Sequence, residues 1–206
     1  MAKDEKFDCI VVGVGGQGSI FASGVLGETA LREGYDVISA ETHGMAQRGG
    51  TVEVHVRIGS SYGPLVPLRS ADAIVGLEPA ECLRFARYLS PQGTAIINTH
   101  VVPAAGSDYP PVANLLLVLA ATCGDIIAYD ATRLALEAGH PQTLNVVMLG
   151  TLAHLLPFTT LKDVIAEYVP KKALEANMRA FELGQKYSKR NLSSSSFVKK
   201  QKDLSD

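Results

Sequence analysis

Short runs of apolar, β-forming residues recur along the chain, and each stops at a glycine or a polar residue. The run 9–12 stops at Gly13 and the run 71–77 stops at Glu78, which is typical of strands buried in a sheet. Between such runs the apolar positions change to a spacing of about 3.6 residues, which indicates helices with one buried face. The expected strands are 9–12, 35–40, 51–58, 65–68, 71–77, 93–98 and 125–129, and the expected helices are 19–33, 80–89, 114–122, 133–138, 143–156, 161–168 and 171–187.

One of these strands, 51–58, alternates strictly between apolar and polar residues. Its valines and Ile58 should face the core, while Glu53, His55 and Arg57 should face water or a partner. A glycine-rich turn follows, and 65–68 is expected to return as a short edge strand where Pro67 is tolerated. Together the two strands predict a β-hairpin inserted into the α/β chain.

These elements predict an α/β fold, a single Rossmann-like domain with a mixed sheet, helices on both faces and an inserted β-hairpin. The domain is expected to span 1–187, and a length of 206 residues suits one well-packed unit. Residues 188–206 are rich in serine and lysine and lack periodicity, so we expect a disordered polar tail.

A glycine-rich loop links the first strand to the first helix. Gly13, Gly15 and Gly18 have the G-x-G-x-x-G spacing, in which the glycines allow a tight turn, close approach of an anion and close helix–strand packing. The helix that follows directs its free N–H groups at this loop, which suits a phosphate. Glu41, 23 residues after Gly18, could bind a ribose hydroxyl. The candidate cofactor-binding residues are Gly13, Gly15, Gly16, Gln17, Gly18 and Glu41. The alternative is that the glycines only permit packing and that Glu41 is solvated or caps a loop.

A second glycine-rich loop, 42–50, joins two expected strands, where a dehydrogenase would begin another crossover helix. It combines a histidine, a hydrogen-bonding glutamine and Arg48, which could clamp an anion. We interpret the loop as an interface or active-site loop; the alternative is a structural loop in which Arg48 pairs with Glu41 or Glu53. Its candidate residues are Thr42, His43, Gly44, Met45, Gln47, Arg48, Gly49 and Gly50.

The other polar residues favour structural roles. Glu78 precedes Pro79 and Asp130 precedes a helix, so both are expected to cap helix N-termini. Asn145 and His154 lie in the very apolar segment 143–156, where a core hydrogen bond is the expected role. We name no catalytic residue and no metal ligand.

Composition excludes several classes of function. A hydrophobic fraction of 47% with 19% charged residues describes a globular protein, and a net charge of −2 gives little support to nucleic-acid binding. The longest apolar run, 112–123, is too short to span a membrane, and the charged first residues do not resemble a secretion signal. The three cysteines lie far apart in apolar segments, as buried free thiols in a reducing compartment would. We therefore expect a cytoplasmic protein.

Several segments carry a family resemblance: GVGGQG, ETHGMAQRGG, VEVHVRIG, GPLVP, ADAIVGLEPAECLR, IINT and NVVMLGTLAHLLP, in this order. On these segments the chain resembles, over about residues 7 to 187, the gamma domain of the thiamine-diphosphate-dependent 2-oxoacid:acceptor (pyruvate:ferredoxin) oxidoreductases. Within that family it is similar to the small (beta) subunit of indolepyruvate:ferredoxin oxidoreductase. The resemblance implies oxidative decarboxylation of a 2-oxo acid, with coenzyme A as acyl acceptor and ferredoxin as electron acceptor.

The resemblance also implies a partner, because this sequence lacks parts that such chemistry needs. Iron–sulfur clusters require closely spaced cysteines, whereas Cys9, Cys82 and Cys123 are far apart. The sequence also lacks an acidic motif for the Mg²⁺ of thiamine diphosphate. We therefore expect a hetero-oligomer in which a larger subunit binds thiamine diphosphate, Mg²⁺ and [4Fe–4S] clusters, and ferredoxin accepts the electrons.

Within such a complex, our hypothesis is that GVGGQG contacts coenzyme A and that ETHGMAQRGG packs at the subunit interface near the thiamine site. Two alternatives remain open: a purely scaffolding subunit, or an independent NAD- or flavin-binding oxidoreductase. Aryl pyruvates, indolepyruvate among them, are favoured as substrates by the resemblance alone.

Overall fold

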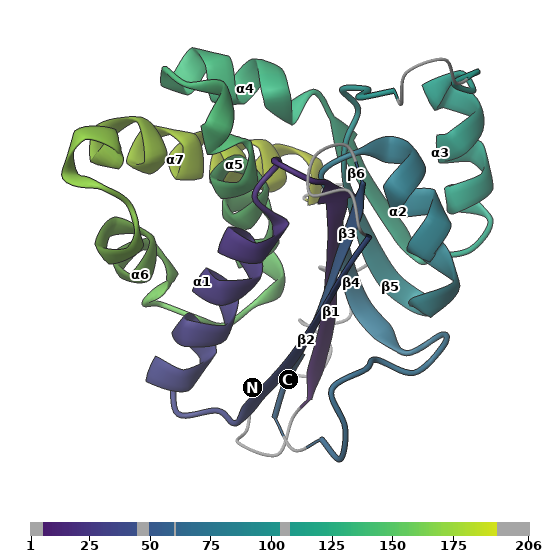
Figure 1. The fold of residues 1–206 in the computed structure, drawn as a ribbon, viewed down its shortest axis with the longest axis horizontal. Helices are drawn as coiled ribbons and strands as arrows, with labels where there is room; N and C mark the ends of the chain where they lie inside the picture. Colours follow the sequence, from purple (N-terminus) through teal and green to yellow (C-terminus); the bar gives the residue numbers. More distant parts are fainter. Residues whose placement is uncertain (1–5, 45–49, 60, 104–107, 193–206) are drawn as a thin grey trace.

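The computed structural model describes residues 6–44, 50–59, 61–103 and 108–192, and these form one mixed six-stranded sheet between two layers of helices (Figure 1). The strands are β1 Phe7–Val14, β2 Val37–His43, β3 Thr51–Ile58, β4 Ala71–Gly76, β5 Leu89–Asn98 and β6 Asp125–Tyr129. The helices are α1 Ser19–Arg32, α2 Pro79–Phe85, α3 Val112–Ala120, α4 Ala131–Ala138, α5 Leu144–Leu152, α6 Leu161–Tyr168 and α7 Leu174–Leu192. The α/β class and the mixed sheet predicted from the sequence are confirmed.

The strand order is β2-β3-β1-β4-β5-β6. Strands β1, β4, β5 and β6 pair in parallel, whereas β3 is antiparallel to both of its neighbours. Val11 of β1 is opposite Val54 of β3 on one side and Val75 of β4 on the other. The chain therefore contains a hairpin, but its two arms are β2 and β3. The prediction that 65–68 forms the second arm is wrong, because this segment is not a strand.

The segment after β3 instead covers the polar face of that strand. Val66 N donates to Nδ1 of His55 at 3.0 Å, and Arg57 donates to the carbonyl of Gly63 at 2.9 Å. Arg57 also binds both carboxylate oxygens of Asp8, at 2.8 and 3.0 Å. Only 1% of the His55 side chain is exposed. The expectation that this face meets water or a partner is therefore wrong at His55 and Arg57, because the chain itself supplies their hydrogen-bond partners.

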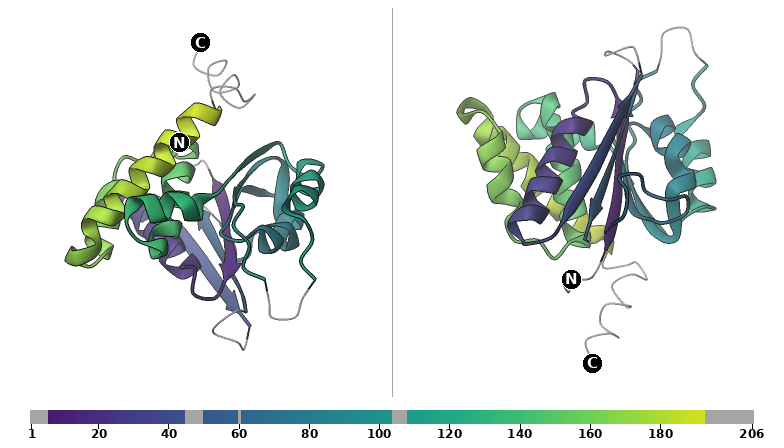
Figure 2. Two further views of the ribbon diagram at one scale, coloured as in Figure 1. Left: turned by 90° about the horizontal axis from the view of Figure 1, so that it is seen from above. Right: turned by 60° about the horizontal axis from the view of Figure 1, so that its bottom comes forward.

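The two helical layers differ in thickness. Helices α2 and α3 cover one face of the sheet, and α1 with α4 to α7 covers the other (Figures 1 and 2). All nine residues of α5 are buried, as its apolar sequence predicted. Helix α5 lies so close to α7 that a Cβ at Gly184 would be 2.0 Å from the Val147 carbonyl oxygen. This contact fixes α5, and with it the first residues of α5 near the glycine loop.

The helix ends follow the capping rules. Glu78 accepts a hydrogen bond from Glu81 N at 3.0 Å and Asp130 accepts one from Arg133 N at 2.8 Å, which confirms both predicted caps. Helix α7 ends at Leu192, five residues beyond the predicted end of the domain at 187. The rest of the predicted tail lies outside the described residues. No helix in the described part of the chain is both long enough and apolar enough to cross a membrane.

The buried His55 gives a test of this arrangement through pH. Burial, together with the nearby positive charge of Arg57, lowers the pKa of His55. The unfolded chain, with a histidine pKa near ~6.5, then binds more protons than the folded protein, so stability present at neutral pH is lost as the pH falls below that value. His55→Asn keeps an acceptor for Val66 N but removes the titration. When the pH falls from about 7 to 5.5, the unfolding free energy of the variant should decrease by up to ~1 kcal/mol less than that of the parent.

Urea unfolding at several pH values measures this difference. The matched control is His100→Asn, which makes the same substitution at an exposed histidine. Burial raises the pKa values of Glu53 and Asp72. Their contributions to the unfolding free energy are therefore lost as the pH rises, the opposite direction to that of His55. Both residues are present in all three proteins. Equal pH dependence of the parent and His55→Asn would contradict the burial of His55.

Candidate functional site

The first glycine loop joins the end of β1 to α1 and is held to the end of β4 by one side chain. Gln17 accepts a hydrogen bond from Val14 N at 2.7 Å and donates one to the Leu77 carbonyl at 3.0 Å. A Cβ at Gly13 would lie 2.8 Å from Oε1 of Gln17. In open α/β sheets, ligands usually bind in the crevice between the loops that follow two neighbouring strands, at the point where the strand order reverses. Here Gln17 occupies that crevice, between β1 and β4.

The end of the loop packs against α5. Gly18 has a φ of +86°, the left-handed region that favours glycine, and it precedes the first residue of α1. Asn145 donates to the Gly18 carbonyl at 3.4 Å, and a Cβ at Gly18 would lie 2.1 Å from its Nδ2 atom. Asn145 thus has the structural hydrogen bond predicted for it, and it fixes the N-terminus of α1 against α5.

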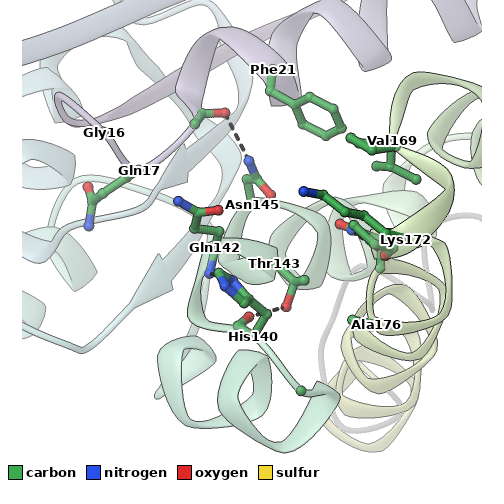
Figure 3. Close-up of a pocket in the computed structure, with 15 residues that line it drawn as sticks. Gly16, Gln17, Phe21, His140, Gln142, Thr143, Asn145, Val169, Lys172 and Ala176 are labelled. Atoms are coloured by element: carbon green, nitrogen blue, oxygen red, sulfur yellow. Dashed lines mark hydrogen bonds between the residues drawn. The ribbon is translucent and has the colours of Figure 1, made fainter.

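A pocket of about 640 Å³ opens on this side of the loop, between the start of α1, the α4–α5 connection and the start of α7 (Figure 3). The Lys172 side chain extends into the pocket towards Phe21 and Asn145 (Figure 3). His140 lies at the opposite wall, where its Nδ1 accepts a hydrogen bond from Gln142 N at 3.2 Å, which leaves Nε2 as the proton-bearing nitrogen of the neutral ring. The full lining is Gly16, Gln17, Gly18, Phe21, Gly139, His140, Gln142, Thr143, Asn145, Val169, Pro170, Lys172, Ala173, Ala176 and Asn177.

The charge distribution of the pocket favours an anion. The described residues that line it include a lysine and a histidine but no carboxylate. Two helical segments begin there without a side-chain cap: α1, and the one-turn helix Lys171–Ala173 that leads into α7. The helical segment that leads into α5 also begins there, but the His140 side chain caps it. Uncapped N-termini present free N–H groups and the positive ends of helix dipoles. A phosphate would meet donors from the backbone and from Lys172 together.

The structure distributes the predicted cofactor-binding residues unevenly. Gly16, Gln17 and Gly18 line the pocket, with the Gln17 side chain directed away from its centre (Figure 3). Gly13 lies behind them in the close contact with Gln17, and Gly15 lies in the turn. Glu41 is not near this loop, because β3 separates β2 from β1, and its side chain lines a different groove beside α1. The sheet order therefore removes Glu41 from any ligand in this pocket.

The second glycine loop meets the first one. Gly50 accepts a hydrogen bond from Gly15 N at 2.8 Å, and Gly44 N donates to the Thr51 carbonyl at 3.3 Å, which closes the β2–β3 hairpin. Thr42 and His43 are exposed at the end of β2. The other predicted residues of this loop, Met45, Gln47, Arg48 and Gly49, lie outside the described residues.

The far wall of the pocket was not predicted from the sequence. Lys172, His140 and Asn177 come from segments more than 100 residues beyond the glycine loop, and only the fold brings them to it. Two signals were available: a lysine pair directly after Pro170 at the start of a helix, and a histidine before Pro141 at the start of another. A lysine at a helix start opposes the helix dipole, so the lysine pair indicates a site for an anion.

The burial predicted for the three cysteines is confirmed for two of them. Cys9 and Cys82 are buried and Cys123 is partly buried, and burial raises the pKa of each. Within the described ranges no three histidine, cysteine or acidic side chains are grouped so that they could hold a metal ion.

Comparison with known proteins adds the family context. The model of the pyruvate ferredoxin/flavodoxin oxidoreductase family matches residues 8–187. The chain is 39% identical over 188 residues to indolepyruvate oxidoreductase subunit IorB of Archaeoglobus fulgidus, covering 87% of this chain and 94% of the relative. Its fold is similar to the gamma subunit of a keto/oxoacid ferredoxin oxidoreductase from Geobacter sulfurreducens, with a TM-score of 0.69, 21% identity, and 89% and 99% of the two chains covered.

A larger enzyme contains the same fold as a part. It is the 2-oxoglutarate:ferredoxin oxidoreductase from Magnetococcus marinus, solved with 2-oxoglutarate, coenzyme A and succinyl-CoA bound. The TM-score is 0.71 at 20% identity, and the match covers 93% of this chain but 32% of that one.

The contact between Gly18 and Asn145 yields a stability test. Gly18→Ala imposes both left-handed backbone strain and overlap with Asn145, so we expect a loss of about 3 kcal/mol in unfolding free energy. Gly16→Ala is the matched control: Gly16 also has a positive φ, +103°, but no atom lies within 4 Å of a Cβ there, so only about 1–2 kcal/mol should be lost. Urea unfolding measures both variants.

The double variant Gly18→Ala/Asn145→Ala should recover the part of the loss that comes from overlap. A strictly additive double variant would show that the overlap with Asn145 is not the cause.

Proposed function

The chain belongs to the pyruvate ferredoxin/flavodoxin oxidoreductase family, and from this premise we propose that its pocket at the start of α1 receives coenzyme A while a larger subunit carries out the redox chemistry. The chain is a subunit of an oxidoreductase complex that acts on a 2-oxo acid with ferredoxin as acceptor. In the overall reaction the 2-oxo acid loses CO₂, its acyl group passes to the thiol of coenzyme A, and two electrons reduce ferredoxin.

The position of Lys172 is the observation that carries the coenzyme A assignment. Its amine extends into a pocket of about 640 Å³ at which two uncapped helical segments begin, and the described lining lacks carboxylates. Coenzyme A has an adenosine diphosphate with an additional phosphate, so it suits such a site. Phe21 and Val169 add apolar surface on which an adenine ring could pack. The Magnetococcus marinus enzyme, which contains this fold, is known with coenzyme A bound.

The remaining cofactors belong to the partner in this proposal. Thiamine diphosphate supplies the carbanion stabilisation and [4Fe–4S] clusters supply the one-electron steps. Both are assigned to the larger subunit with Mg²⁺, because Cys9 and Cys82 of this chain are buried in opposite layers of its core and are unavailable as ligands. The cytoplasm, a reducing compartment, is the proposed location of the complex.

The second glycine loop is proposed to contact the larger subunit near its thiamine site. The Gly15–Gly50 hydrogen bond places one end of this loop directly beside the proposed coenzyme A site. A partner held by Thr42, His43 and the residues that follow would therefore lie next to the acyl acceptor. Such an arrangement supplies the proximity that acyl transfer needs.

A scaffolding role without a ligand is the second candidate, and one observation favours it. Gln17 fills the crevice at the strand-order reversal, and Gly13 and Gly18 each have a packing reason to be glycine. The two candidates differ in whether Lys172 affects coenzyme A.

Lys172→Met tests the pocket. In the assembled complex we expect the Michaelis constant for coenzyme A to rise about tenfold, the equivalent of ~1.4 kcal/mol, because the charge that faces the phosphates is lost. The turnover number at saturating coenzyme A should stay close to the parent value. Lys171→Met is the matched control, since Lys171 is the neighbouring lysine but does not line the pocket. An unchanged Michaelis constant in Lys172→Met would favour the scaffolding role.

We also propose an aryl pyruvate, indolepyruvate in particular, as the 2-oxo acid, on the strength of the 39% identity to the Archaeoglobus fulgidus subunit. The assembled complex should reduce ferredoxin with indolepyruvate at a specificity constant at least about tenfold above those for pyruvate and 2-oxoglutarate. Initial rates with the three acids at fixed coenzyme A measure the preference. A higher constant for 2-oxoglutarate would refute the assignment.

A further inference from the structure

Strand β2 is an edge of the sheet with one side unpaired. Gly59 N donates to the Asp36 carbonyl and Gly44 N donates to the Thr51 carbonyl, so the even-numbered positions of this strand direct their backbone groups towards β3. The odd-numbered positions, Val37, Ser39, Glu41 and His43, therefore direct their N–H and C=O groups outwards. None of the described strands pairs with that side. An exposed edge of seven residues is a template for pairing with another chain.

Helix α1 lies on one face of the sheet next to this edge. It packs chiefly against β3, and its outer face carries Ile20, Gly24, Gly27 and Leu31 at helical spacing. Ile20 is 53% exposed and Leu31 is 54% exposed, whereas a Cβ at Gly24 would meet no atom within 4 Å. The outer face of α1 is therefore only partly covered, and Gly24 leaves open space in the middle of that face.

The result is a groove of about 360 Å³ between α1 and β2. One wall is formed by Val37, Ser39 and Glu41, the same residues whose backbone groups point outwards. Tyr168 of α6, which is 47% exposed, also lines the groove. Helix α6 is held beside α1 because Glu33 accepts hydrogen bonds from Thr159 N at 2.8 Å and Thr160 N at 2.9 Å. The groove is thus a fixed feature of the fold.

We propose that the larger subunit of the complex docks here by adding one extended segment to the β2 edge. Backbone groups of the segment pair with Ser39 and Glu41, and large apolar side chains of the segment enter the groove over Gly24 and Gly27. This inference rests on the chain being a subunit of such a complex, and it is independent of where coenzyme A binds.

A second copy of this chain fits the groove less well. Pairing β2 with its own copy would place the two α1 helices three strand spacings apart, about 14 Å, because each helix lies over its β3. Packed helices are roughly 8–10 Å apart. The facing Gly24 and Gly27 could not fill the difference, whereas a segment with its own bulky side chains could.

Two further features agree with the larger subunit as the occupant. Glu41 lines the groove, and the partner described for its carboxylate is Nε2 of His43, at 4.0 Å, so the segment should carry a basic residue opposite Glu41. Strand β2 also continues directly into the second glycine loop, which we propose to contact the same subunit. One partner surface would then extend from the groove to the neighbourhood of the coenzyme A pocket.

Hydrogen exchange of single amides tests the pairing. In the isolated full chain, the amides of Ile38, Ala40 and Thr42 should exchange slowly because β3 binds them, and those of Ser39 and Glu41 should exchange quickly. In the complex with the larger subunit, the Ser39 and Glu41 amides should slow at least about tenfold. Unchanged exchange at both positions in the complex would overturn the proposal.

Gly24→Leu tests the groove. The leucine fills the open space on an exposed helix position, so the isolated chain should melt at a higher temperature, while its affinity for the larger subunit should fall by about tenfold or more. Ala113→Leu adds the same side chain to an exposed position of α3 in the opposite helical layer and should leave the affinity unchanged. Ser39→Pro removes an N–H that β3 does not bind and should also weaken assembly. Parent-like affinity in both Gly24→Leu and Ser39→Pro would refute the docking site.

The same measurements separate the other occupants. If residues 193–206 of this chain covered the edge, the Ser39 and Glu41 amides would be protected in the isolated chain and exposed by removal of that segment. If a second copy covered it, protection would rise with protein concentration and sedimentation would show a dimer that Gly24→Leu abolishes. Either result would overturn the assignment to the larger subunit without affecting the coenzyme A test.

Discussion

The position of the start of α1 is the constraint on which the rest of the structure depends. Three hydrogen bonds fix it: Gln17 to the Leu77 carbonyl, Asn145 to the Gly18 carbonyl, and Gly15 N to Gly50. They join this point to β4, to α5 and to the β2–β3 hairpin. A long helix held at its first turn has a fixed axis, so both the pocket at its N-terminus and the groove along its outer face are defined by the same contacts.

Local sequence patterns were sufficient to predict most helices and strands. They were not sufficient to predict which of these elements lie next to each other in the fold. Period-two and period-3.6 spacing, together with Glu78 and Asp130 as caps, predicted strands and helices because these signals act within a few residues. Pairing of 51–58 with 65–68 was wrong because alternation in a sequence does not identify the partner strand. The burial of His55 was also unpredictable, since its partner, Val66 N, belongs to a segment without regular structure.

The candidate site shows the same division. The glycine spacing correctly indicated a tight turn into a helix N-terminus, because each glycine requirement is local: a positive φ at Gly16 and Gly18, and a close contact at Gly13. The opposite wall depends on tertiary structure. Lys172 lines the same pocket as the glycine loop because Gly150 and Gly184 allow α5 and α7 to approach within backbone contact, which positions the start of α7.

The antiparallel strand β3 explains why this chain differs from a dinucleotide-binding domain with the same glycine fingerprint. In such a domain the second strand lies beside the first, and its terminal acid reaches the ribose of the cofactor. Here β3 lies between β1 and β2, so Glu41 is displaced by one strand and faces the groove at the sheet edge. The same insertion leaves β2 unpaired on its outer side and ties the second loop to Gly15. The insertion of β3 thus prevents Glu41 from contacting a nucleotide bound at the glycine loop. With the docking proposed here, it also makes β2 part of the surface that binds the catalytic partner.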